Sequence, residues 1–304
     1  MSSRSPTSRT AAFAFAYVTT AYALGGVLAW LVASRLLIGA PTWAVILAAD
    51  AAATVAVFVF SVVFDNSSFY DPYWSVAPMV IAPWLFVSSA SGAPFARKIM
   101  VLALVLLWGA RLTWNWARGW QGLAHEDWRY VDMRKKAKRA YWLVSFVGIH
   151  MMPTLWVYLG CLALLPALAT GTRPLGVLDA LGLVVTGSAI AIETIADEQL
   201  RAFRLSAPRG GSILNRGLWA LSRHPNYLGE LSFWWGLWLF GLAADPSAYV
   251  TALGPLSITV LFVFVSVPML DRRSVARRPA YADHMARVPG LVPRPWRRAP
   301  EGRT

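Results

Sequence analysis

The residues with the clearest capacity for chemistry lie in one short stretch, from Gly217 to Glu230. This stretch begins as a basic loop and continues into an apolar segment. Five side chains near its end could take part in binding or catalysis: Arg223, His224, Asn226, Tyr227 and Glu230. Pro225 suits the first position of a helix, which places Asn226 and Glu230 one turn apart on one face. The free amides of such a helix start, together with Arg223, predict an anion site.

Two further groups of charged side chains adjoin apolar segments. The first has spacings of four, four and three, so its members share one helix face: Glu193, Asp197, Arg201 and Arg204. A solvated helix end explains Arg201, whereas Glu193 lies about one turn deeper, where a carboxylate needs a partner. The second group lies between Asp271 and Tyr281 and contains four arginines. These arginines either anchor a helix to anionic lipid or, with those of the other groups, surround a pyrophosphate and a ribose phosphate.

The composition indicates that membrane-spanning helices position these groups. Of the 304 residues, 57% are hydrophobic, only 14% are charged and 16 are Trp, a residue enriched at membrane interfaces. The predicted fold class is all-α, a polytopic membrane helix bundle of about seven to eight transmembrane helices with a cofactor pocket at its cytoplasmic side. Eight apolar segments are predicted to span: 11–38, 42–64, 76–90, 99–116, 141–168, 175–196, 226–243 and 249–270. They form one integral membrane domain, residues 11–296, between an N-terminal tail (1–10) and a flexible C-terminal tail (297–304).

Lys and Arg are distributed unevenly over the predicted loops. With the N-terminus inside, 23 of the 28 Lys and Arg residues fall in inside segments, as the positive-inside rule requires. The sequence therefore predicts an inner-membrane protein with both termini in the cytoplasm. The segment 76–90 is short and contains two prolines, so it is predicted to be tilted, kinked or only partly inserted.

Several other classes are disfavoured. The formal charge of +13 suggests nucleic acid, but the basic residues lie in short loops between apolar runs, so no nucleic-acid partner is predicted. Only four histidines are present, too few for a membrane di-iron enzyme, and no metal site is predicted. No Ser/His/Asp arrangement points to a hydrolase. The single cysteine, Cys161, excludes an intrachain disulfide and is expected to be a small core residue.

Together, these residues resemble the steroid 5-alpha-reductase superfamily, especially its bacterial DUF1295 group, over about residues 193–293. The resemblance implies a multi-span bundle that holds NADPH at its cytoplasmic side and reduces an enone carbon–carbon double bond. By position it implies cofactor contacts for Asp197, Arg204, Asn226, Glu230, Arg273 and Tyr281. Asp71, in a short polar loop, falls where the reductases carry a glutamate that engages the substrate carbonyl. From its local sequence alone, Asp71 is a turn residue or helix cap.

The chain departs from the family pattern at two positions. Glu193 falls where the steroid enzymes have an asparagine. Trp108 falls where they have a substrate-orienting tyrosine, and Tyr73 or Tyr70 could take the role of that tyrosine. The cofactor half of the resemblance is therefore closer than the substrate half.

The predicted function is an NADPH-dependent membrane reductase of an activated double bond in a lipophilic substrate, such as a sterol, isoprenoid or fatty compound. Arg204, Arg223 and Arg273 are expected at phosphates. The rest of the cofactor is expected to contact Asp197, His224, Asn226, Tyr227, Glu230 and Tyr281, with Asp71 and Tyr73 as catalytic candidates. One alternative is an S-adenosylmethionine-dependent enzyme resembling isoprenylcysteine methyltransferases, which share the Arg-His-Pro motif. A second is a non-enzymatic protein whose partners are membrane lipids.

Overall fold

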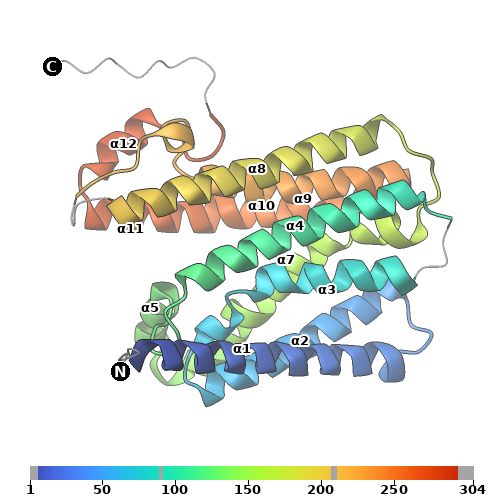
Figure 1. The fold of residues 1–304 in the computed structure, drawn as a ribbon, viewed down its shortest axis with the longest axis horizontal. Coiled ribbons are helices and arrows are strands. Elements are labelled where there is room, and N and C mark those ends of the chain that lie inside the picture. Colours follow the sequence, from blue (N-terminus) through green and yellow to red (C-terminus); the bar gives the residue numbers. More distant parts are fainter. Residues whose placement is uncertain (1–5, 89–91, 207–210, 294–304) are drawn as a thin grey trace, which may run out of the picture.

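The fold was obtained as a computed structural model that describes residues 6–88, 92–206 and 211–293. Within these ranges every regular element is helical and no strand occurs, which confirms the all-α class. The α-helices are α1 (Pro6–Leu31), α2 (Thr42–Val63), α3 (Tyr73–Ser88), α4 (Phe95–Gly119), α5 (Trp128–Ala137), α6 (Tyr141–Ser145), α7 (Met152–Cys161), α8 (Val177–Ser206), α9 (Pro225–Ala244), α10 (Leu253–Leu261), α11 (Val267–Arg277) and α12 (Tyr281–Arg287). The long helices run side by side along the longest axis of the molecule (Figure 1).

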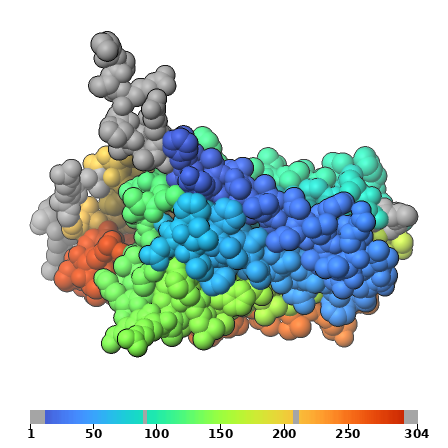
Figure 2. Space-filling view, turned by 90° about the horizontal axis from the view of Figure 1, so that it is seen from below, coloured from blue at the N-terminus to red at the C-terminus, as the bar shows by residue number. Residues whose placement is uncertain are grey.

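The bundle has two halves joined through its middle. In one half α1 packs on α2, and in the other α8 packs on α9, which also contacts α10. Helix α3 packs on α4 and on α7, while α4 contacts α8. Helices α1 and α2 cover much of the face seen in Figure 2. The central helices α3, α4 and α7 therefore separate the α1–α2 pair from the α8–α9 pair.

Five helical segments of the described chain are long and apolar enough to cross a membrane. They are Ala12–Leu36, Thr42–Val63, Trp128–Thr170, Val177–Ser206 and Pro246–Arg277. Helices α3, α4 and α9 lie alongside them (Figure 1). The chain is thus a membrane helix bundle, and the total of eight spans stays a prediction.

Prolines are accommodated in two different ways. Helix α3 remains one α-helix although it contains Pro78 and Pro83, and it runs along the bundle beside α4. Elsewhere the helix widens into a π-helical turn next to a proline. Such turns comprise Phe146–Met151, just before Pro153, and Phe262–Ser266, just before Pro268. A proline cannot donate to the preceding turn, and a π turn changes the local hydrogen-bond register without ending the helix.

Several predicted boundaries need correction. Helix α1 already begins at Pro6, so the predicted tail 1–10 is partly helical, while the predicted tail 297–304 lies outside the described residues. Helix α8 continues to Ser206, which confirms the helical spacing predicted from Glu193 to Arg204, and α11 continues to Arg277, beyond the predicted end of its span. Charged side chains at these ends extend the helices toward water, where apolarity no longer marks the boundary. The end of the bundle formed by α5, α12 and the ends of α8 and α11 is hereafter the basic end.

Glycines allow α8 and α9 to approach closely. A Cβ atom at Gly236 of α9 would lie 2.1 Å from Thr186 Oγ1 of α8, and one at Gly229 would lie 2.9 Å from the backbone oxygen of Ala189. Small residues at a helix interface bring the backbones into direct contact in a membrane. This packed pair supports the polar groups at the basic end.

Candidate functional site

A cavity of about 360 Å³ lies at the basic end, among α5, α8, α9, α11 and α12. This volume falls within the roughly 300–1,000 Å³ typical of ligand pockets. Six of the residues predicted to bind the cofactor line it: Arg204, Arg223, His224, Asn226, Tyr227 and Tyr281. Asp197, Glu230 and Arg273 are not among its lining residues. The fold therefore brings two-thirds of a set chosen from sequence into one cavity.

The lining is strongly basic, but its four arginines differ in what they already bind. Arg129 pairs with Asp127, its Nε 2.8 Å from Oδ1. Arg278 donates from Nη1 to the backbone oxygen of Ser212 at 2.8 Å. Arg204 has no hydrogen bond or ion pair with any residue in the described ranges, and its side chain is exposed. Arg204 and the remaining donors of Arg278 are thus accessible to an anionic group.

Arg223 and His224 hold the wall of the cavity together. The Arg223 guanidinium binds both carboxylate oxygens of Asp271, with Nη2 2.7 Å from Oδ2, and its Nη1 donates to two backbone oxygens of the segment 285–288. His224 Nε2 lies 3.0 Å from Asp271 Oδ1. The amides of Arg223 and His224 donate to the backbone oxygens of Pro289 and Gly290. The donors of Arg223 are therefore engaged in fixing the start of α9 and the segment after α12.

The first turn of α9 faces this cavity. Pro225 occupies its first position and the His224 side chain makes no capping bond, so the first amides remain without a side-chain acceptor. The Asn226 amide donates to Asp197 Oδ1 at 3.3 Å. Tyr227 stacks against His224, with ring centroids 5.7 Å apart. Tyr281 and His284 of α12 also line the cavity. Burial raises the pKa of the Tyr281 hydroxyl and lowers the pKa of the His284 imidazole.

Asp197 belongs to a buried polar cluster next to the cavity. Arg111 of α4 pairs with two carboxylates of α8, at 2.5 Å from Glu193 and 2.8 Å from Asp197. Asn115 also donates to Asp197, at 3.0 Å. Arg111 is therefore the partner expected from the sequence for a carboxylate buried as deeply as Glu193.

Glu230 accepts hydrogen bonds from three indoles. Trp74 and Trp234 donate to Oε1 at 2.7 and 2.8 Å, and Trp108 donates to Oε2 at 3.2 Å. Glu230 is buried, and Trp108 is fully buried with its ring stacked on Phe233 at 4.2 Å. We call the largely buried group formed by Arg111, Glu193, Asp197, Glu230 and the three tryptophans the acid–indole cluster. Glu230 is surrounded by indoles in this structure, away from the cavity lining.

The remaining predicted residues lie around the cavity or on its far side. Arg273 covers the ring of Trp128, a lining residue, with its guanidinium carbon 3.6 Å from the ring centroid. Asp71 accepts a hydrogen bond from Tyr130 at 2.7 Å. Burial raises the pKa of Asp71 from 3.8 to about 6, against the opposing effect of the nearby Arg129. Asp71 thus lies behind the α5 wall of the cavity.

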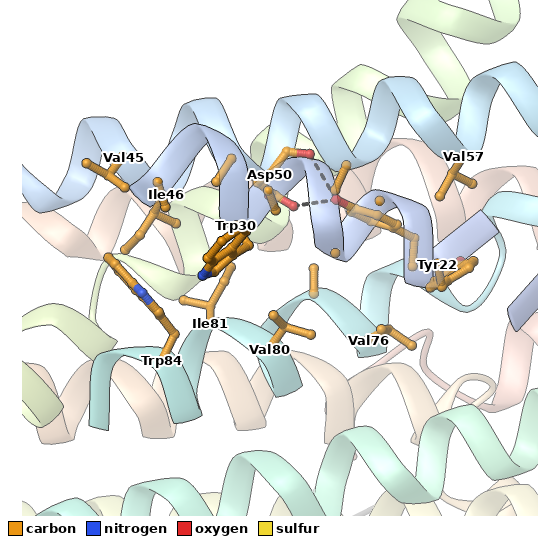
Figure 3. Close-up of a pocket in the computed structure, with 18 residues that line it drawn as sticks. Tyr22, Trp30, Val45, Ile46, Asp50, Val57, Val76, Val80, Ile81 and Trp84 are labelled. Atoms are coloured by element: carbon orange, nitrogen blue, oxygen red, sulfur yellow. Dashed lines mark hydrogen bonds between the residues drawn. The ribbon is translucent and has the colours of Figure 1, made fainter. Parts of the chain in front are cut away.

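Tyr73 points into a different hollow. Its hydroxyl donates to Asp50 of α2, 2.7 Å from Oδ1 and 2.9 Å from the backbone oxygen. Both residues line a groove of about 230 Å³ among α1, α2 and α3 (Figure 3). Tyr70 stacks on Tyr73, with centroids 4.8 Å apart, and its hydroxyl lies 2.6 Å from Thr154 Oγ1.

Sequence reasoning missed Asp50, Arg129 and His284. Asp50 carried a usable signal, because it is the one acid in the apolar run that forms α2, and ionisable residues within a span are functional candidates. Arg129 and His284 carried none, since they reach the cavity from loops and short helices whose placement depends on the tertiary fold.

A protein family described as "Protein of unknown function (DUF1295)" matches residues 57–288. An uncharacterized protein of Schizosaccharomyces pombe is 27% identical over 252 residues, which are 75% of this chain and 73% of that protein. No solved structure matches the chain significantly. The matched range contains the cavity and the acid–indole cluster, whereas α1 and Asp50 precede it.

Proposed function

The chain belongs to the DUF1295 family, and from the chemistry of its cavity we propose that it is an NADPH-dependent membrane reductase. The basic end would face the cytoplasm, where the positive-inside rule places it, in an inner (plasma) membrane. The observation that carries the proposal is one cavity that holds Arg278, the first turn of α9 and Arg204, which has no partner among the described residues.

The lining suits a phosphorylated dinucleotide. Arginine binds phosphate with paired donors, and the free amides at a helix start favour an anion. Arg204 and Arg278 are therefore assigned to phosphates. Asn226, Tyr227 and Tyr281 are assigned to the ribose and base, where hydrogen bonds and ring contacts are needed. Arg223 contributes by holding the wall, because its donors already bind Asp271 and backbone oxygens.

When bound, NADPH supplies a hydride, and reduction of a double bond also needs a proton. Asp71 carries a proton at pH values below about 6 and is hydrogen-bonded to Tyr130. We assign Asp71 as the proton reservoir for the reaction. Retention of full turnover in Asp71→Asn would reduce this residue to a link between α5 and the loop before α3.

The test of cofactor binding is a thermal-shift comparison of the purified protein with NADPH, NADH and S-adenosylmethionine. We expect the largest stabilisation from NADPH, because it has an additional ribose phosphate. Arg204→Ala should abolish this shift. Arg201→Ala is the matched control, since Arg201 lies one turn earlier on α8 and does not line the cavity; it should keep the full shift.

Two outcomes would replace the proposal. Stabilisation by S-adenosylmethionine alone would identify a methyltransferase, although a basic lining disfavours a sulfonium cation. No stabilisation by any of the three compounds, with the apo protein folded, would favour the non-enzymatic lipid-binding alternative.

A further inference from the structure

The groove among α1, α2 and α3 contains one carboxyl group in apolar surroundings. Asp50 is the one acid in its lining, and none of its lining residues is basic. Apart from the hydroxyls of Tyr22 and Tyr73, its other side chains are aliphatic or aromatic. In Figure 3, apolar side chains that include Ile46, Ile81 and Trp84 lie to one side of Asp50. The Tyr73 hydroxyl donates a hydrogen bond to Asp50 Oδ1. An isolated carboxyl here is costly unless something satisfies it.

Asp50 is only partly satisfied by the protein. The residue is 6% exposed, and the Tyr73 hydroxyl occupies Oδ1. The second oxygen, Oδ2, is buried and has no hydrogen-bond partner within the described chain. Asp50 follows the first residue of α2 by eight positions, or about 12 Å along the helix, which is inside the hydrocarbon layer. The neutral acid is the form that such surroundings favour, and its Oδ2–H then needs an acceptor.

The groove is accessible from the lipid. Trp30 is 57% exposed and Val80 is 56% exposed, although both line it. Gly26 also lines the groove, and a Cβ atom built there meets no atom within 4 Å. Because α1 and α2 form an outer face of the bundle (Figure 2), a ligand can reach the groove from the membrane rather than from the cavity at the basic end.

We propose that this groove binds a membrane-resident lipophilic molecule through one neutral oxygen acceptor, a carbonyl group that accepts the hydrogen bond of Asp50. The apolar walls hold the hydrocarbon part, and Tyr73 fixes the orientation of the Asp50 carboxyl. The site is spatially separate from the proposed cofactor cavity: it lies on other helices, and α1 and Asp50 precede the range matched by the family.

The proposal is tested with the full chain in nanodiscs, without any dinucleotide. Three photoactivatable probes are compared: a long-chain methyl ketone, the corresponding hydrocarbon and the corresponding primary amine. Labelled peptides from α1–α3 are quantified by mass spectrometry. We expect the ketone to label them about tenfold more than the hydrocarbon, as one hydrogen bond in an apolar site predicts.

Substitutions at Asp50 distinguish the chemistry of the ligand. Asp50→Leu should remove the preference for the ketone, whereas Asp50→Asn should retain most of it, because an amide still donates. Equal labelling by ketone and hydrocarbon in the unsubstituted protein, or a preference that survives Asp50→Leu, would overturn the proposal. A preference for the amine that both substitutions abolish would instead identify an ionised carboxylate and a cationic ligand.

A pair of glycine substitutions tests the location without altering Asp50. Gly26→Leu places a side chain in the mouth of the groove and should lower labelling by all three probes at least fivefold, roughly the effect of losing 1 kcal/mol of binding. Gly187→Leu on α8 is the control, because its Cβ likewise meets no atom within 4 Å and it lies outside the groove lining. Equal labelling of the two variants would place the ligand elsewhere.

Discussion

A buried carboxyl group lies behind the wall of the cavity at the basic end and another lies in the groove among α1–α3, but the protein treats the two groups differently. Asp271 is 5% exposed and is bound by Arg223 and His224. Asp50 is 6% exposed and receives only the Tyr73 hydroxyl. The first carboxylate is compensated inside the fold and therefore contributes to the structure. The second keeps one oxygen unused, as expected of a group retained for a ligand.

The largest loss of stability should come from removing Asp271, the carboxylate that Arg223 and His224 bind. Asp271→Leu leaves the partly buried Arg223 without its counter-ion, which costs roughly 3 kcal/mol of unfolding free energy. Unfolding in mixed detergent micelles measures this loss. Asp283→Leu, at an exposed position of α12, is the control and should change stability by less than about 0.5 kcal/mol. A small loss of stability in Asp271→Leu would mean that Asp271 contributes no more to the structure than Asp50 does.

The second prediction concerns Asp71, which lies between the two regions. Burial raises its pKa from 3.8 to about 6, so the folded protein holds this proton more tightly than the unfolded chain. This contribution is fully present below about pH 4 and is lost as the pH rises through 6, a difference of up to about 3 kcal/mol. Unfolding free energies measured across this window should therefore fall with pH, unless other groups oppose the change.

Two substitutions identify the group responsible. Asp71→Asn should remove this component of the pH dependence. Tyr130→Phe keeps the ring but removes a hydrogen bond that lowers the pKa of Asp71, and should move the transition to higher pH. An unchanged profile in both variants would assign the titration to a different residue.

Those lining residues of the cavity could be predicted from the sequence that lie close together in the chain or at a regular helical spacing. Arg223, His224, Asn226 and Tyr227 are nearly consecutive, and a proline marks the helix start among them. Arg204 was identified through its spacing on α8. What the sequence could not indicate was competition among neighbours: Arg223 binds Asp271 rather than remaining free, and Glu230 binds three tryptophans drawn from three helices.

A third prediction compares helix packing in the two regions. Gly236→Ala should cost about 1–3 kcal/mol, because the new Cβ atom would lie 2.9 Å from the backbone nitrogen of Thr186 and the helices must separate. Gly26→Ala should cost less than about 0.5 kcal/mol, since its Cβ atom meets nothing within 4 Å. Thermal unfolding of the two variants provides the comparison, and equal losses would show that the groove is as tightly packed as the α8–α9 interface.

The smallest effect is expected at Asp50. Asp50→Leu removes a partly unsatisfied carboxyl and adds apolar contacts, while the Tyr73 hydroxyl keeps the backbone oxygen of residue 50 as an acceptor. Stability without ligand should therefore change by less than about 1 kcal/mol, measured as for Asp271→Leu. A loss as large as that of Asp271→Leu would indicate that Asp50 has a structural role.

The helical class followed from composition, because long apolar runs have few alternatives in a membrane. The groove could not be predicted from composition, because it depends on how α1, α2 and α3 are rotated about their axes. Sequence shows that Asp50 and Tyr73 are polar, but not that α2 and α3 turn them toward each other. The same holds for Arg111, whose two partners on α8 are more than eighty residues away in the chain.

Tyr73 and Trp74 are consecutive residues of α3 that serve the two halves of the molecule. Tyr73 donates to Asp50 in the groove, and Trp74 donates to Glu230 in the acid–indole cluster. A rigid helix cannot rotate one of these side chains without displacing the other. Any ligand that shifts the first turn of α3 must therefore change the free energy of both the groove and the acid–indole cluster. By thermodynamic reciprocity, a ligand in the groove and a ligand that displaces the acid–indole cluster then change each other's affinity by the same factor.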